Sequence, residues 1–287
     1  MRIALTIVLL IAAVAVGAWL GGRESLPQAF EGPTLYLSFI DLSDGDSVLV
    51  QTPEGGAALI GAGGPDSGKD LASYLKQHGV NRLDLLVLSC PRPEHLGGAI
   101  DIVNEIRVEH VLDTSCLPVS PLHEGVLRRI AEKHVLYKTA HAGQVFRLGS
   151  QTRIDILLPQ RLPLTQRPSQ ADNMPIVARV SFGGVNILLL DGSGSEAEGQ
   201  LIAGNADLRC SVVKLGSGGG SRGASNEFLR LAKPAYAALS AGRGESKPNR
   251  GTLRRLEAAQ VQTLSARGNG AVVIATDGRA IRVGAER

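Results

Sequence analysis

The chain has 287 residues, of which 44% are apolar and 20% charged, as is typical of folded globular proteins and not of disordered chains. Aromatic residues make up only 3%, which argues against a surface that stacks the bases of single-stranded nucleic acid. The formal charge of +3 is small and the lysines and arginines are scattered, which excludes a broad nucleic-acid footprint and leaves room only for a local basic patch.

An apolar stretch, Ile3–Gly22, follows Met1 and Arg2 at the N-terminus. Its length is close to the roughly 20 residues that span a bilayer, so we expect an N-terminal hydrophobic helix that acts as a signal-anchor. Trp19 suits the membrane interface and favours this interpretation. The small residues at Ala15–Gly17 leave a cleaved signal peptide as the alternative. In either case the remainder is expected outside the cytoplasm, anchored to the membrane, or periplasmic or secreted if the leader is cut.

From Thr34 onward, short β-rich runs alternate with helical patterns, which predicts layers of sheet and helix. The first three strands are expected to form an antiparallel meander, because turn residues separate them. In chain order, the first half is predicted to contain strands 36–42, 47–52, 57–60, 83–89, 111–114 and 135–138, and helices 69–78, 96–106 and 121–133.

A second half with a similar order begins at Gly143. Its strands are predicted at 154–158, 176–182, 185–190, 211–215, 236–240 and 272–276, and its helices at 196–203, 226–232 and 250–259. The polar stretch Arg161–Asp172 is the most linker-like part of the chain, and its composition suits an inserted loop as well as a domain boundary. We therefore treat 1–30 as leader and short linker, and 31–287 as one domain.

The three cysteines, Cys90, Cys116 and Cys210, are widely spaced and odd in number. They predict neither a disulfide framework nor a CxxC metal site.

Two sequence motifs near the start of the predicted domain resemble those of a known family. The chain reads FIDLSDGDSVLV at 39–50 and LIGAGG at 59–64. These stretches resemble the F-x-D-V-G-Q-G-D-S and L-I-D-A-G-G motifs that open the metallo-β-lactamase-like domain of ComEC-type DNA-uptake proteins. The resemblance continues in order to Pro248, and it implies a four-layer αββα sandwich of the α/β (α+β) class.

The resemblance also implies a site for one or two metal ions, usually zinc, built on S-H-x-D/H-x-D-H-x-G-G. At 89–98 this chain reads SCPRPEHLGG. His95 matches a ligand position, whereas Cys90, Arg92 and Glu94 take the places of other ligands. An arginine cannot ligate a metal ion and repels a divalent cation.

The later ligand-bearing segments depart further from the pattern. Asp191 is displaced by one residue from the aspartate of T-G-D, and Ser217 and Gly218 stand in place of the histidines of G-H-H-G-S. Lys247 replaces the histidine before Pro248, and Gly61 replaces the aspartate of D-A-G-G.

These losses favour an exported pseudoenzyme or binding domain with no cofactor. An anionic ligand or nucleic acid would suit the positive charge and the backbone N–H groups that gather in the former metal site. The charges are those of Arg92 and Lys247, and also Arg222 and Arg243, and the N–H groups are those of Gly218, Gly219 and Gly220. The competing interpretation is that the glycines form a collapsed loop and that the arginines are solvated. A protein partner, including a transport channel of the DNA-uptake type, is also compatible with the resemblance.

The alternative is an active metal-dependent hydrolase, of phosphodiesterase or nuclease type, with an altered mononuclear zinc site formed by Cys90, Glu94, His95 and Asp191. A Cys90–His95 nucleophilic dyad and a Ser217 nucleophile are weaker hypotheses, because no orienting group or companion base accompanies them. The other histidines are expected to be surface or satisfied structural residues: His78, His110, His123, His134 and His141.

Overall fold

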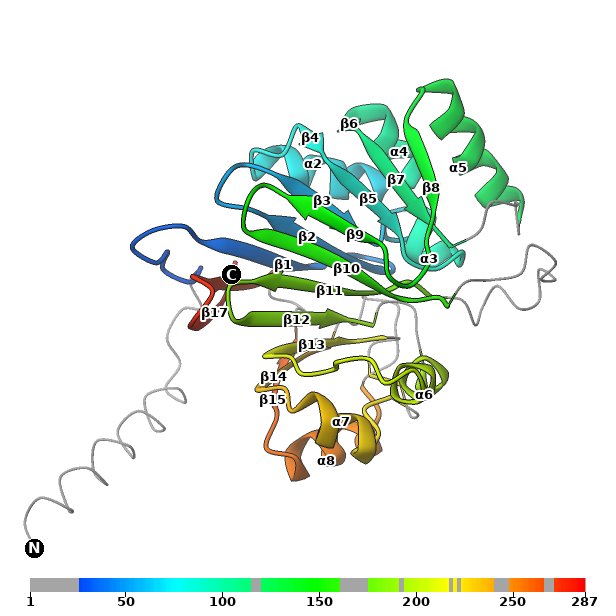
Figure 1. Cartoon of the computed structure of the whole chain (residues 1–287). Coiled ribbons are helices and arrows are strands. Elements are labelled where there is room, and N and C mark those ends of the chain that lie inside the picture. The colour runs from blue at the N-terminus through cyan, green and yellow to red at the C-terminus, as the bar shows by residue number, and fades with distance from the viewer. Residues whose placement is uncertain are drawn as a thin grey trace, which may run out of the picture.

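Two mixed β-sheets packed face to face, each covered by helices on its outer side, form the core of the computed structural model (Figure 1). The structure describes residues 26–114, 120–160, 175–190, 194–216, 219–220, 223–239, 248–265 and 271–286. The predicted N-terminal hydrophobic helix lies outside these residues. Within them, no helix is both long and apolar enough to cross a membrane.

The first sheet has the strand order β17-β16-β1-β2-β3-β5-β7-β8. Its β1–β2–β3 segment is the predicted antiparallel meander, whereas β3, β5, β7 and β8 run parallel. The strands are β1 (Leu35–Asp41), β2 (Asp46–Gln51), β3 (Ala57–Ile60), β5 (Leu85–Leu88), β7 (His110–Asp113), β8 (Leu136–Thr139), β16 (Ala271–Thr276) and β17 (Ile281–Ala285).

The second sheet has the order β15-β14-β13-β12-β11-β10-β9, again with an antiparallel part, β9 to β12, and a parallel part, β12 to β15. Its strands are β9 (Val145–Leu148), β10 (Thr152–Leu158), β11 (Val177–Phe182), β12 (Val185–Leu189), β13 (Val212–Leu215), β14 (Tyr236–Leu239) and β15 (Gln262–Ser265). A small parallel pair, β4 (Arg82–Leu83) with β6 (Arg107–Val108), lies apart from both sheets.

Helices cover the two outer faces (Figure 1). On the first sheet lie α2 (Gly68–Gln77), α3 (Pro93–Leu96), α4 (Ala99–Glu105) and α5 (Pro121–Glu132), and on the second lie α6 (Ser195–Ala203), α7 (Asn226–Ala232) and α8 (Arg250–Ala258). The start of α5 shows why these segments are helical: Pro121 occupies the first turn, and the Ser120 hydroxyl accepts a hydrogen bond from the His123 N–H at 3.1 Å.

Three separate hydrophobic clusters fill the three spaces between the four layers. One joins the facing surfaces of the sheets, through residues such as Phe39, Val50 and Phe182. The second fills the space between the first sheet and its helices, and the third the space between the second sheet and its helices. Because each strand alternates between two buried faces, most strands are apolar throughout. The predicted αββα sandwich is confirmed.

The helix predicted over 96–106 is wrong at its start, since the segment forms two helices, α3 and α4, separated by Gly97 and Gly98. Pro93 begins the first of them. The N–H of Gly98 is directed at the carbonyl of Gly63 at 3.4 Å, which lies outside the helix. The chain thus leaves the helical conformation at Gly97 and Gly98, where it contacts the loop that contains Gly63, although the apolar periodicity continues through this point.

Candidate functional site

The candidate site lies along one edge of the sandwich, where the parallel strands β3, β5 and β7 all end. Asp46, the first residue of β2, lies at the same edge, because β2 runs antiparallel to β3 and Val48 pairs with Ile60. We call this the strand-end edge; in the first sheet it comprises residues 41–46, 61–65, 89–98 and 113–114. Parallel strands place every loop that follows them on one side, which is why motifs distant in sequence meet here.

Backbone hydrogen bonds lock these loops together. The N–H of Ala62 donates to the carbonyl of His95 at 2.8 Å, the N–H of Gly63 donates to Asp46 at 3.2 Å, and the N–H of Gly64 donates to Asp44 at 2.9 Å. The hydroxyl of Ser47 adds a bond to the carbonyl of Gly61 at 2.9 Å. The glycine-rich motifs are therefore scaffold, since they allow one backbone to approach another.

Gly45 is the tightest of these positions. Its φ of +76° is left-handed, and a Cβ added there would overlap the carbonyl oxygen of Glu94. Gly55 has a similar φ of +84°, but nothing lies within 4 Å of an added Cβ. The two glycines thus share a backbone conformation and differ in the space around them.

We predict that Gly45→Ala lowers the free energy of unfolding by about 3 kcal/mol, because overpacking adds to the cost of the left-handed backbone. Gly55→Ala should cost only about 1 kcal/mol, the backbone contribution alone. Urea unfolding followed by circular dichroism measures both. Equal losses in the two variants would contradict the interlocked loops.

Arg92 and His95 lie side by side at the centre of the strand-end edge. The Nη2 of Arg92 is 3.4 Å from the Nε2 of His95, and the His95 side chain is buried at 1% exposure. Since an arginine nitrogen only donates, His95 accepts through Nε2 in this pair. The Nε of Arg92 also lies 3.8 Å from the Glu94 carboxylate. The guanidinium therefore faces both the imidazole and the carboxylate that the sequence pattern places as metal ligands.

Most of the remaining predicted site residues lie outside the part of the chain that the structure describes. Cys90 is described and is fully buried. Asp191, Ser217, Gly218 and Lys247 lie outside the described residues, as do Arg222, Arg243 and Cys116. Within the part of the chain that the structure describes, no three histidine, cysteine, aspartate or glutamate side chains are grouped to hold a metal ion.

The glycine loop after β13 is used by the fold itself. The N–H of Gly219 donates to the carbonyl of Gly216 at 3.1 Å, and the carbonyl of Gly220 accepts from the Thr252 hydroxyl at 2.8 Å. This loop thus packs against the beginning of α8. The N–H of Gly219, one of the predicted anion donors, already serves a turn.

A buried ion pair that the motifs did not indicate joins the two sheets at this edge. The Nζ of Lys214 on β13 is 2.9 Å from the Oδ2 of Asp46 on β2, and both side chains are completely buried. Asp46 shares a strand face with Val48 and Lys214 shares one with Val212, and both valines belong to the core between the sheets. The sequence held a signal for the inward position of Lys214. Side chains alternate between the two faces of a strand, so in Val-Val-Lys-Leu the lysine lies on the same face as the first valine.

We predict that Lys214→Met lowers the free energy of unfolding by about 3–5 kcal/mol, since it leaves the Asp46 carboxylate buried without this cation. The double variant Asp46→Leu/Lys214→Met should recover most of that loss, because no charge is then buried. Chemical denaturation of the wild type, of the single variants Asp46→Leu and Lys214→Met and of the double variant gives the coupling energy between the two side chains.

The exposed pair Lys76–Glu105, at 2.8 Å, is the matched control. Lys76→Met should cost at most about 1 kcal/mol, because solvent screens this pair. If Lys214→Met cost no more than Lys76→Met, the buried pair would not be a major constraint on the fold.

A second buried polar cluster surrounds Asp113 at the end of β7. Its carboxylate accepts hydrogen bonds from the Nε2 of His123 at 2.7 Å, the Tyr137 hydroxyl at 3.0 Å and the Thr114 N–H at 2.6 Å. The His123 and Asp113 side chains are fully buried. The cluster fastens α5 and β8 to β7, so the prediction of a satisfied structural histidine is confirmed for His123.

Burial also affects Cys210, which lies just before β13. Desolvation, with a smaller contribution from the charge of Asp207, raises the pKa of its thiol to about 12. The side chain is a free cysteine and is buried. It is therefore expected to be a neutral thiol near pH 7.

This geometry defines the class of fold. The chain is similar to the metallo-beta-lactamase fold protein YhfI from Bacillus subtilis, with a TM-score of 0.51 and 10% identity over 80% of this chain and 95% of that one. It is also similar to Zn²⁺-bound PqqB from Methylobacterium extorquens, with a TM-score of 0.50 and 10% identity over 77% of this chain and 85% of that one. The chain has the metallo-β-lactamase fold, as the motifs predicted.

One relative in sequence is ComE operon protein 3 from Bacillus subtilis (strain 168), which is 24% identical over 255 residues. The match covers 82% of this chain but 32% of that protein, so the chain spans about a third of its relative. No family model matches the chain. The predicted ComEC-like relationship is confirmed by this similarity.

Proposed function

We propose that this chain is a non-catalytic binding domain in which an arginine occupies the position that a metal ion holds in the catalytic members of its fold. The observation that carries the proposal is the 3.4 Å approach of Arg92 Nη2 to His95 Nε2. A zinc ligand must offer a lone pair to the metal, and this imidazole nitrogen offers its lone pair to a guanidinium instead.

The donor set around His95 supports the same proposal. Glu94 faces Arg92 at 3.8 Å, and among the described residues no three histidine, cysteine, aspartate or glutamate side chains are grouped, whereas a zinc site needs three or four convergent nitrogen, sulfur or oxygen ligands. A guanidinium keeps its charge at any pH at which the protein is folded. The described residues of this edge therefore do not fit the one- or two-metal centre that the resemblance implies, and we derive no hydrolytic step through it.

The proposed ligand of the strand-end edge is anionic. Arg92 supplies a positive charge that is 30% exposed, and Lys247 would add another if it lies at the position that the sequence pattern assigns. A phosphate or carboxylate suits a guanidinium because two parallel N–H groups match two oxygens.

We further propose that the domain is exported. The apolar stretch Ile3–Gly22 after Met1 and Arg2 supports a signal-anchor, or a signal peptide if it is cleaved. The similarity to ComE operon protein 3 is compatible with a role beside a membrane protein. The domain would then face the outside of the cytoplasm.

We predict that the purified protein, produced with added zinc, holds well below one zinc per chain, because Arg92 repels the cation. Arg92→His should raise the zinc content, since it replaces that cation with an imidazole next to His95. Arg82→His, in which the exposed Arg82 of β4 gains the same imidazole elsewhere, is the control and should not change it. Inductively coupled plasma mass spectrometry measures the metal.

Stoichiometric zinc in the wild type that is lost in His95→Ala and Cys90→Ala would reject the pseudoenzyme. It would support the alternative, an active hydrolase with a mononuclear site.

A further inference from the structure

A shallow groove lies between α7 and α8, on the outer side of the second sheet and on helices that carry none of the predicted metal-ligand positions. It has a volume of about 430 Å³ and is lined by Asn226, by apolar side chains and by three cations, Arg230, Lys233 and Arg255. None of its lining residues is an aspartate or a glutamate. We call it the α7–α8 groove.

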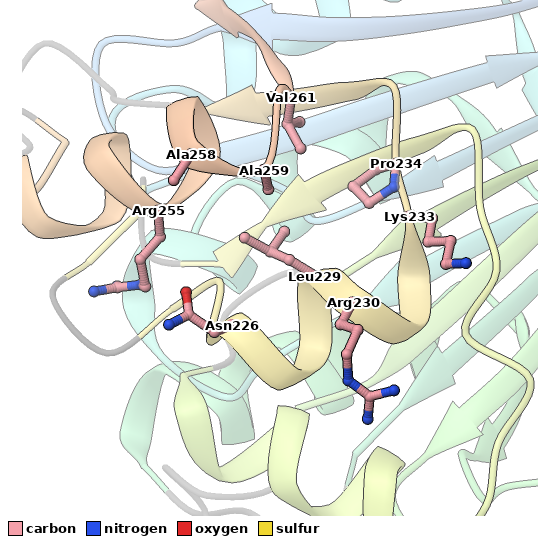
Figure 2. A pocket seen from close by; sticks show the side chains of 9 residues that line it. All are labelled: Asn226, Leu229, Arg230, Lys233, Pro234, Arg255, Ala258, Ala259 and Val261. Carbon is pink, nitrogen blue, oxygen red and sulfur yellow. The ribbon is translucent and has the colours of Figure 1, made fainter.

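Figure 2 shows how charge and apolar surface are distributed in this groove. Leu229, Pro234 and Ala259 lie at its centre, with Ala258 and Val261 beside them. The head groups of Arg230, Lys233 and Arg255 lie around this centre and point in different directions. A single small anion could not contact all three cations, whereas an extended occupant could.

The charge carried by α7 and α8 differs from that carried by α2, α4 and α5 on the opposite side of the sandwich. Residues 226–233 and 250–259 carry five cations and two carboxylates, whereas α2, α4 and α5, together with Lys133, carry five of each. In that opposite layer Lys76, Arg128 and Arg129 form ion pairs at 2.8, 3.2 and 2.9 Å. Among the residues that the structure describes, Arg230 and Lys233 form no ion pair with another side chain, so their charges are available to a partner.

Arg255 is held in place by neutral groups. Its Nε donates to the carbonyl of Ala224 at 2.9 Å, and its Nη2 donates to the carbonyl of Gly223 at 2.7 Å and to the Thr252 hydroxyl at 2.9 Å. These three hydrogen bonds to carbonyl and hydroxyl oxygens hold the orientation of the guanidinium. One side of the groove is thus pre-organised, which lowers the entropic cost of binding.

We propose that the α7–α8 groove binds an acidic segment of a partner protein in which an aliphatic side chain is flanked by carboxylates. The aliphatic side chain would pack on Leu229, Pro234 and Ala259, and the carboxylates would pair with Arg230, Lys233 and Arg255. This arrangement is a groove with an apolar floor and a charged rim, as in other peptide-binding surfaces.

The described residues favour this occupant over two others. A lipid surface would need large apolar side chains that project outward, and on these two helices only Leu253, at 36% exposure, is a large exposed apolar residue. A nucleic acid strand would favour aromatic side chains for stacking, and none lines the groove. A groove with an aliphatic floor leaves a peptide as the best match.

Fluorescence anisotropy with the full chain tests the proposal. The probe is a fluorescein-labelled peptide of about ten residues with two leucines flanked by glutamates, a length that covers one groove. Arg230→Glu/Lys233→Glu is expected to weaken its binding about tenfold or more, because attractive pairs become repulsive. Ala258→Trp, at an exposed position, should weaken it by filling the groove.

Lys133→Glu is the matched control. Lys133 is the C-cap residue of α5 as Lys233 is of α7, so it is compared with the single variant Lys233→Glu, which makes the same charge change at the same helical position. Lys133→Glu should leave the affinity unchanged. Peptides in which serine replaces leucine, or glutamine replaces glutamate, should each bind more weakly than the probe.

The proposal is overturned if the peptide shows no saturable binding, or if Lys133→Glu weakens it as much as the groove variants do. It is also overturned if a single-stranded oligonucleotide or an anionic lipid vesicle binds in its place with the same dependence on Arg230 and Lys233. Circular dichroism of each variant establishes that it is folded. These outcomes are independent of the zinc content of the strand-end edge.

Discussion

The contact between Asp46 and Lys214 places one negative and one positive charge, 2.9 Å apart, in the apolar space between the two sheets. Removing two such groups from water costs several kcal/mol for each ion, and only a close pair offsets that cost. A shift of either sheet at this edge would separate the charges, so the pair fixes how the sheets meet. The loops after β3 and β5 are built on that junction, since the carbonyl of Asp46 also accepts the N–H of Gly63.

The scaffold of the strand-end edge and its chemistry are therefore separable. Glycines at 45, 61, 63, 64, 97 and 98 let backbone pack on backbone, and at His95 and Glu94 this packing uses the main-chain carbonyls and not the side chains. Arg92 can replace a ligand without disturbing these contacts, because its guanidinium extends from the loop toward His95 and Glu94. The fold thus persists while the site changes from one that attracts cations to one that carries a cation.

The sequence predicted most of the fold because buried strands are strongly patterned. The meander β1–β3 and the strand Leu85–Leu88 were found from apolar runs between turn residues. The edge strands β9, β15 and β17 were missed because polar and exposed residues interrupt them. These strands are short and few of their residues are buried, so neither an apolar run nor a clear alternation marks them.

For the site, motif comparison put Arg92 and His95 on one short loop, and their side chains lie 3.4 Å apart in the structure. It could not find the Asp46–Lys214 pair, because the partners are 168 residues apart. The α7–α8 groove was equally hidden: Arg230, Lys233 and Arg255 become neighbours only when α7 packs beside α8. The composition left room for a local basic patch but did not locate one.

The central claim is that a guanidinium, and no metal ion, faces His95. X-ray diffraction from crystals soaked in zinc, with data collected on both sides of the zinc absorption edge, tests it most directly. The account predicts no anomalous peak at a bonding distance of about 2.1 Å from His95 Nε2, and electron density for the Arg92 guanidinium near that nitrogen. A zinc peak at that distance, with Arg92 displaced, would contradict it.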